Sequence, residues 1–194
     1  MAMDRSEVFK WNVSEHRQVL EALVAFESEV QRAAEILIHA IQNGKAILLA
    51  GNGGSASDAQ HIAGEFVGRY LLERAGAAAI ALGASDAALT SIGNDYGFEQ
   101  VFSRQVEAFR LQAGAVVLYS TSGNSPNILR AAQTARQLQI PVIGMTGETG
   151  GKLSELCDVC IKIPSKTTPR IQEMHALVGH ILCEMVESSI PKSA

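Results

Sequence analysis

Apolar residues in the first 44 positions recur at steps of three and four, the spacing that places side chains on one face of an α-helix. They are Leu20, Leu23, Val24, Val30, Ala33, Ala34, Leu37 and Ile41. One helix of about 40 residues would be unusually long for a globular protein. The pattern therefore predicts two helices between Asp4 and Gly44, with a break near Phe26 and an end at Gly44.

Five short apolar runs follow, each bounded by Gly, Ser or Pro. They occupy residues 46–50, 78–82, 115–119, 141–145 and 159–163, and amphipathic stretches of helical length lie at 55–72, 98–109, 124–138, 151–157 and 168–188. Continuous apolar strands that alternate with helices are typical of a parallel sheet covered on both faces. We therefore predict an α/β fold, a three-layer sandwich with a five-stranded parallel sheet and an N-terminal helical hairpin. It would form a single domain over residues 1–194, with the N-terminal helices in 1–44 and the α/β core and C-terminal helix in 45–194.

Composition narrows the class of protein. Hydrophobic residues make up 47% of the chain and charged residues 19%, enough for a core that needs no disulfides. The net charge of −4 gives no basic field for nucleic acid. No apolar run reaches the ~20 residues of a membrane helix, and the N-terminus has no apolar segment typical of a signal peptide. Three cysteines do not make a disulfide framework. We expect a cytoplasmic protein with no nucleic-acid or membrane partner.

Two loops follow strands and open helices, at the edge of a parallel sheet where ligands usually bind. In the loop at 51–58, three glycines allow the backbone to approach a ligand closely. In the loop at 120–126, four hydroxyls and the helix N–H groups suit a phosphate. Both could also be ordinary helix caps and tight turns. Neither loop matches the P-loop or dinucleotide-binding pattern, so we expect no nucleotide cofactor.

Ionisable residues lie on two of the predicted helices. His61 and Glu65 are four apart and share one helix face, and Glu65 is a candidate general base among apolar neighbours that could desolvate it. Gln172 and His180 are on the last helix, with Cα atoms roughly 12 Å apart. Two His, one Glu and one Gln would suit Zn²⁺ if the side chains converge or come from different subunits. Alternatively, His61 and Glu65 form a surface pair and His180 is a core histidine. Cys157 and Cys160 suggest buried thiols.

Several motifs together resemble the bacterial phosphoheptose isomerases of the sugar-isomerase (SIS) domain family. They are GNGGSASDAQH at 51–61, EFVGR at 65–69, GNDYGF at 93–98, STSGNS at 120–125 and RIQE at 170–173. STSGNS marks only the wider superfamily, whereas the other segments are more specific. The resemblance covers nearly the whole chain and implies an SIS-type, flavodoxin-like sheet. It also implies an aldose–ketose isomerase that interconverts sedoheptulose 7-phosphate and D-glycero-D-manno-heptose 7-phosphate through a cis-enediolate. This reaction is the first step of ADP-/GDP-heptose biosynthesis, which supplies lipopolysaccharide.

The resemblance also implies roles for individual residues. The phosphate would be bound by Ser120, Thr121, Ser122 and Ser125. The sugar would be contacted by Asn52, Gly53, Gly54, Ser55, Glu65, Asn94, Asp95 and Gln172. Zinc would be held by His61, Glu65, Gln172 and His180, and Glu65 and His180 would be the acid–base pair. His175 lies outside the motif match. The family forms homotetramers with sites shared between subunits. Ala75 and Pro169 depart from the family pattern and leave the finer substrate contacts open.

Three alternatives remain at this point. Close relatives of the family act as non-catalytic partners of the bacterial replication initiator, but they lack the equivalent of Glu65. Retention of Glu65 and His180 therefore favours catalysis. A ligand-sensing SIS domain is disfavoured because we find no DNA-binding segment. An isomerase for a different ketose phosphate would carry the same motifs.

Overall fold

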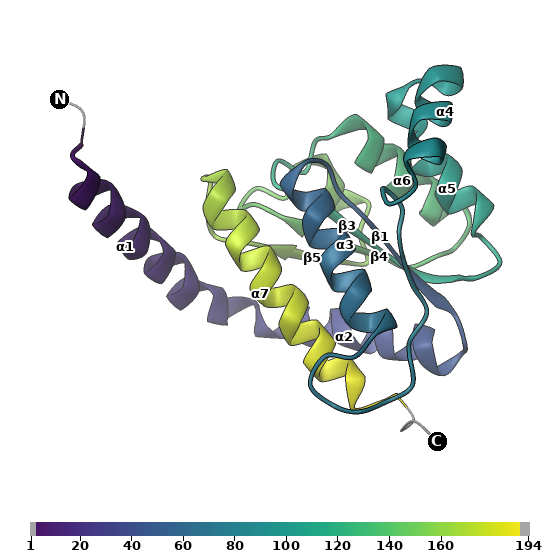
Figure 1. Cartoon of the computed structure of the whole chain (residues 1–194), viewed down its shortest axis with the longest axis horizontal. Coiled ribbons are helices and arrows are strands. Elements are labelled where there is room, and N and C mark those ends of the chain that lie inside the picture. Colours follow the sequence, from purple (N-terminus) through teal and green to yellow (C-terminus); the bar gives the residue numbers. More distant parts are fainter. Residues whose placement is uncertain (1–2, 191–194) are drawn as a thin grey trace.

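A computed structural model describes residues 3–190 and shows a three-layer α/β sandwich (Figure 1). Its five strands are β1 (Ala46–Ala50), β2 (Ala79–Ala81), β3 (Ala113–Ser120), β4 (Val142–Thr146) and β5 (Val159–Lys162). All neighbouring strands are parallel, in the order β2-β1-β3-β4-β5. This is the flavodoxin-like order, and it confirms the predicted fold class. The order reverses between β1 and β3, the point where such sheets usually bind ligands.

Helices cover both faces of the sheet. They are α1 (Arg5–Leu23), α2 (Glu27–Gln42), α3 (Gly54–Val67), α4 (Asp86–Tyr96), α5 (Ser103–Ala108), α6 (Pro126–Gln137) and α7 (Thr168–Glu187), with short 3-10 helices η1 (Val24–Phe26), η2 (Phe98–Gln100) and η3 (Gly151–Glu155). One face packs against α2, α3 and α7, and the other packs against α5 and α6. Because β1, β3 and β4 are buried on both faces, their sequences are continuous apolar runs.

Local chemistry explains where the N-terminal helices begin and end. The Asp4 carboxylate accepts a hydrogen bond from the Glu7 N–H, and the Glu7 carboxylate accepts one from the Asp4 N–H, which starts α1. The 3-10 turn η1 separates α1 from α2 and confirms the predicted break near Phe26. The two helices run on from one another instead of folding back as the predicted hairpin (Figure 1). Gly44 ends the second helix region with a φ of 66°, which glycine adopts without strain.

The structure differs from the prediction at several elements. Helix α4 was not predicted, because none of its residues is fully buried and its apolar residues at helical spacing are few, mainly Leu89 and Ile92. Helix α3 ends at Val67 rather than at residue 72, since the N–H groups of Leu71 and Leu72 bond to a side chain of α7 instead of continuing the helix. The stretch at 151–157 forms the short 3-10 helix η3. No helix within residues 3–190 is long and apolar enough to cross a membrane.

His175 belongs to the core and not to the solvent-facing side of α7. It is fully buried, its Nε2 lies 3.2 Å from the Thr146 carbonyl oxygen and its ring meets Tyr119 edge-on. Burial lowers the pKa of His175 to about 4, because the charged imidazolium would lose its hydration. The residue therefore stabilises the fold only while it is neutral.

We expect acid to destabilise the protein through His175. A folded-state pKa below the unfolded value means that this contribution is complete above about pH 6.5 and is lost as the pH falls towards 4, by about 3 kcal/mol. Urea unfolding at several pH values should reveal this loss in the parent protein and its absence in His175→Gln. His39→Gln, at an exposed position, should keep the parent's pH dependence. Equal pH dependence in parent and His175→Gln would contradict the prediction.

Candidate functional site

The two predicted ligand loops lie side by side at the carboxyl ends of β1 and β3, adjacent strands at the reversal point of the sheet. Asn52, in the loop after β1, and Asn127, at the start of α6, exchange two side-chain amide hydrogen bonds of 2.9 and 2.8 Å. The Asn127 side chain also accepts the Ile128 N–H. Sequence reasoning did not single out Asn127, although an amide directly after the hydroxyl loop is a visible signal. The pair fixes one loop against the other.

The glycines of the first loop are required by close contacts. A Cβ at Gly51 would lie 2.3 Å from the Ser55 carbonyl oxygen, and Gly53 has a φ of 56°. A Cβ at Gly54 would lie 2.6 Å from the Gln172 amide nitrogen. The missing side chain therefore lets Gln172, from α7, reach the loop predicted to contact the sugar.

The second loop forms a compact turn of hydroxyls. Ser120 is buried, and its Oγ lies 3.1 Å from the Ser125 Oγ. The exposed Ser122 Oγ accepts the Asn124 N–H. Gly123 has a φ of 64°, and a Cβ there would lie 2.0 Å from the Gly150 carbonyl oxygen, so the loop packs directly on the next one. Hydroxyls and N–H groups at the start of α6 suit an anion such as a phosphate.

Three ionisable side chains meet where α3 and α7 pack together (Figure 1). The His61 Nε2 lies 3.3 Å from the Glu65 Oε1 and 3.3 Å from the His180 Nε2. Ligand atoms of all three residues lie within 4.8 Å of one another. A Cβ at Gly179 would lie 2.6 Å from the Ile62 side chain, so this glycine lets the two helices approach closely enough for the meeting.

The donor set of this cluster fits a divalent metal ion. Two nitrogens bound to one tetrahedral zinc at about 2.0–2.1 Å would be about 3.4 Å apart, close to the 3.3 Å between the two imidazole nitrogens. The Glu65 side chain is 26% exposed, whereas Ile62, Ala63 and Phe66 face the core. The apolar neighbours of Glu65 therefore do not enclose its carboxylate, as the sequence had suggested they could.

Asp58 adds a further carboxyl group one turn before His61. Burial raises the pKa of Asp58, and His61 partly counteracts this effect. Its Oδ2 is buried without a hydrogen-bond partner in the described part of the chain. The sequence signal was an Asp three residues before a candidate ligand, which is ambiguous without the burial.

Three residues that were predicted to contribute to the site lie away from the cluster. Asn94 and Asp95 are exposed near the end of α4, where the Asn94 amide donates to the Asp95 carboxylate over 2.8 Å. Helix α4 packs on η2, apart from α3 and α7 (Figure 1). Gln172 lies at the first turn of α3, about 12 Å along α7 from His180. Roles for these three residues remain predictions.

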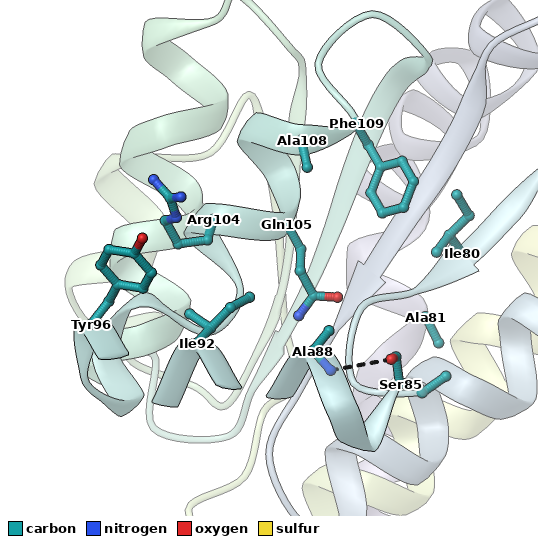
Figure 2. A pocket seen from close by; sticks show the side chains of 11 residues that line it. Ile80, Ala81, Ser85, Ala88, Ile92, Tyr96, Arg104, Gln105, Ala108 and Phe109 are labelled. Atoms are coloured by element: carbon teal, nitrogen blue, oxygen red, sulfur yellow. Dashed lines mark hydrogen bonds between the residues drawn. The ribbon is translucent and has the colours of Figure 1, made fainter. Parts of the chain in front are cut away.

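A cavity of about 600 Å³ lies between β2, α4 and α5 (Figure 2). Its walls are mainly apolar, and its polar side chains contact one another or the backbone. Arg104 stacks 4.4 Å above the Tyr96 ring, and the buried Gln105 amide donates to the Val101 carbonyl. Neither ligand loop nor the His61, Glu65 and His180 cluster lines this cavity. We therefore place the candidate site at the loops and the cluster.

Comparisons with known proteins agree with these observations. A profile of the SIS domain matches residues 13–147. The phosphoheptose isomerase of Helicobacter hepaticus is 53% identical over 173 residues, which cover 89% of this chain and 88% of that protein. The enzyme of the same name from Aneurinibacillus thermoaerophilus is 48% identical over 188 residues, 95% of each chain. The structure of phosphoheptose isomerase from Neisseria gonorrhoeae superposes with a TM-score of 0.89 at 38% identity, covering 95% of this chain and 100% of that one.

Proposed function

Since this chain belongs to the SIS domain family and, within it, to the phosphoheptose isomerases, we infer that it is an aldose–ketose isomerase acting on sedoheptulose 7-phosphate. The product is D-glycero-D-manno-heptose 7-phosphate. One structural observation carries the assignment beyond family membership. A carboxylate and two imidazoles converge where α3 and α7 meet, and α3 begins at the first of two loops suited to a phosphorylated sugar. Isomerisation needs this combination of acid–base groups and a remote anchor.

Substrate binding, as we propose it, divides between the two loops. The phosphate is held by the hydroxyls of the second loop and the N–H groups at the start of α6, namely through Ser120, Thr121, Ser122 and Ser125. The sugar hydroxyls face the first loop through Asn52, Gly53, Gly54 and Ser55, with contributions from Asn94, Asp95 and Gln172. Binding energy from the phosphate, remote from the reacting carbons, then orients C1 and C2 for proton transfer.

We assign the proton transfers to Glu65 and His180. Aldose–ketose isomerisation moves one proton between C1 and C2 and another between their oxygens. The Glu65 carboxylate takes the carbon-bound proton, a cis-enediolate forms, and the same carboxyl group returns the proton to the neighbouring carbon. His180 moves the proton between the oxygens. His61, 3.3 Å from reactive atoms of both residues, helps to hold them in position.

We further propose that this site holds zinc. The ligands would be His61, Glu65 and His180, with Gln172 as the fourth residue that the family resemblance implies. A bound divalent ion supplies electrophilic polarisation of the substrate carbonyl or diol oxygens. Elemental analysis of the purified protein should find about one zinc per chain, and His61→Ala should lower that content. A parent protein that binds no divalent metal would contradict the zinc proposal and leave the isomerase assignment intact.

A homotetramer is the proposed assembly. Support comes from apolar side chains on α1 that are largely exposed in the single chain, with Phe9 at 71% and Trp11 at 59%. An apolar groove also runs between the N-terminal helices and α7, lined by Leu20, Leu23, Val24, Val30, Leu177, Ile181 and Met185. Ile171, near the start of α7, is buried in the core and does not belong to this exposed apolar surface. Light scattering that gives a monomer mass at micromolar concentration would contradict the tetramer.

We also propose a cytoplasmic location, which agrees with the three free cysteines.

An assay with sedoheptulose 7-phosphate tests the function directly. We expect the purified protein to convert the ketose to an aldose, measured by loss of the ketose or by NMR of the anomeric protons. Unphosphorylated sedoheptulose should react far more slowly, because it lacks the anchor. A protein that leaves sedoheptulose 7-phosphate unchanged but converts another ketose phosphate would revise the substrate and keep the reaction class.

Removal of one hydroxyl from the phosphate loop should weaken substrate binding. Ser122→Ala removes a hydrogen bond to a charged group worth about 1.5–3 kcal/mol, so KM for the sugar phosphate should rise roughly 10- to 150-fold. Steady-state kinetics measure the change. Ser28→Ala, at an exposed serine on α2, is the matched control and should leave KM unaltered. An unchanged KM in Ser122→Ala would mean that this hydroxyl does not bind the phosphate.

A further inference from the structure

Tyr70 lies directly against the imidazole of His180. The two rings are stacked, with centroids 5.4 Å apart and planes inclined by 24°. His61 meets the same imidazole edge-on, at 4.9 Å and 85°. The His180 ring is therefore in contact with a flat aromatic face and with the ring of a second histidine.

The second ring nitrogen of His180, Nδ1, has no hydrogen-bond partner within residues 3–190. Functional histidines are commonly oriented by a hydrogen bond from the second ring nitrogen to a carboxylate or a carbonyl. Within residues 3–190, the only hydrogen-bond partner of His180 is the His61 Nε2. Its side chain is partly exposed, so close packing on all sides does not fix it either. A bond at Nε2 alone, to His61 or to the proposed zinc, leaves the ring able to rotate about that bond, so stacking on Tyr70 and the edge-on contact with His61 are what restrain the ring plane.

The segment that carries Tyr70 is itself anchored to α7. The N–H groups of Leu71 and Leu72 donate to the Glu187 carboxylate over 3.1–3.2 Å. Glu187 is buried and lies seven residues, or about two turns, beyond His180 on the same helix. The helix that carries His180 thus also holds the residues that follow Tyr70.

Arg74 connects the same segment to α3. It is buried, its Nε lies 3.7 Å from the Glu187 Oε2, and its guanidinium donates to the Glu65 carbonyl oxygen over 2.7 Å. A second bond of 3.0 Å goes to the Phe66 carbonyl oxygen. Residues 68–74 are therefore tied to the backbone of Glu65 on one helix and to Glu187 on the other.

We propose that Tyr70 is a positioning residue for the isomerisation, whose ring holds the His180 imidazole in the orientation that faces Glu65 and the substrate. Glu187 and Arg74 fix the segment that places this ring. The proposal rests on the role given above to His180. Tyr70 needs its flat face for this purpose, whereas its hydroxyl is dispensable.

Substitutions at Tyr70 distinguish the role of the aromatic ring from that of the hydroxyl. Tyr70→Phe keeps the ring and should stay within about twofold of the parent kcat. Tyr70→Leu removes the flat face and should lower kcat roughly 10- to 100-fold, the usual cost of a misplaced catalytic group, with KM little changed because the phosphate anchor is intact. Tyr70→Met is measured alongside, because methionine is close to leucine in volume and also lacks a flat ring. The test then does not depend on the folding of a single variant.

A spectroscopic measurement tests the stacking without reference to activity. In protein labelled at the histidine Cε1 positions, the ring current of Tyr70 should shift the His180 signal, which His180→Gln identifies. That shift should persist in Tyr70→Phe and disappear in Tyr70→Leu and Tyr70→Met. Parent-like kcat in both ringless variants, or a His180 signal that does not move in them, would overturn the proposal. If the parent protein has no isomerase activity, the proposed function fails, and the signal still decides whether Tyr70 orients His180.

Discussion

Glu65→Gln should lose almost all isomerase activity and keep its fold. The substitution removes the proposed base for the carbon-bound proton, and a positioned general base contributes about 10²–10⁴-fold to the rate. The Glu65 side chain is 26% exposed and its side-chain partner is His61, so glutamine leaves no buried group without a hydrogen bond. We expect kcat to fall by at least 10²-fold in steady-state assays while thermal unfolding stays near that of the parent.

Controls for this experiment come from the same chain. Glu35→Gln, at an exposed position on α2, makes the same chemical change away from the site and should be neutral. His180→Gln should be about as damaging as Glu65→Gln, because proton transfer between the oxygens would lack its carrier. His175 is unsuitable as a neutral control, since its burial makes any substitution a test of the fold. A folded Glu65→Gln protein with near-normal rates would refute the mechanism.

Glu187→Gln should produce the largest loss of stability. The Glu187 carboxylate is 2% exposed, lies 3.7 Å from the equally buried Arg74 Nε and accepts hydrogen bonds from the Leu71 and Leu72 N–H groups. Removing one partner of a buried ion pair leaves the other charge without compensation, at a cost of about 3–5 kcal/mol. Urea unfolding at neutral pH should therefore show a free energy of unfolding lower by that amount.

Glu184 offers a matched control, because it lies on α7 one turn before Glu187 and is exposed. Glu184→Gln should change the free energy of unfolding by less than about 0.5 kcal/mol. Replacing both members of the pair, as in Arg74→Met with Glu187→Leu, should recover part of the loss, because no unpaired buried charge remains. A Glu187→Gln protein as stable as the parent would mean that Arg74 is compensated elsewhere.

Much of the fold could be predicted because the central strands are buried on both faces. Their continuous apolar runs and the glycine and serine boundaries gave the number of strands and the parallel arrangement. Helix α4 was missed for the opposite reason, since no residue from Asp86 to Tyr96 is fully buried and its apolar periodicity is limited to a few side chains such as Leu89 and Ile92. The end of α3 was misjudged because a carboxylate from a distant helix competes for the next backbone N–H groups.

The parts of the site that could be predicted are those whose residues lie close together in the sequence. His61 and Glu65 share a helix face by spacing alone, and each ligand loop lies within one short stretch. The position of His180 beside them depends on how α3 crosses α7, which depends on Gly179 and Ile62. The contacts among Tyr70, Arg74, Glu187 and His180 also form only because α3 and the segment after it pack on α7. No pattern within one segment could therefore have indicated them. The sequence did offer His180 as a candidate ligand, but it could not place the residue beside His61 and left a core histidine as the alternative.

The approach of α3 to α7 at Gly179 has a consequence for how such an enzyme can diversify. In the proposed mechanism, the groups that transfer protons lie on the two helices α3 and α7, whereas the sugar phosphate is expected in two loops at the strand ends. Insertions or exchanges in the loops would change which carbohydrate is accepted and leave the reactive groups at their present spacing. Position 179 is more constrained, because a Cβ there would lie 2.6 Å from the Ile62 side chain, which would have to move. Mutations in the loops could therefore change the preferred substrate of this fold while the reaction that it catalyses stays the same.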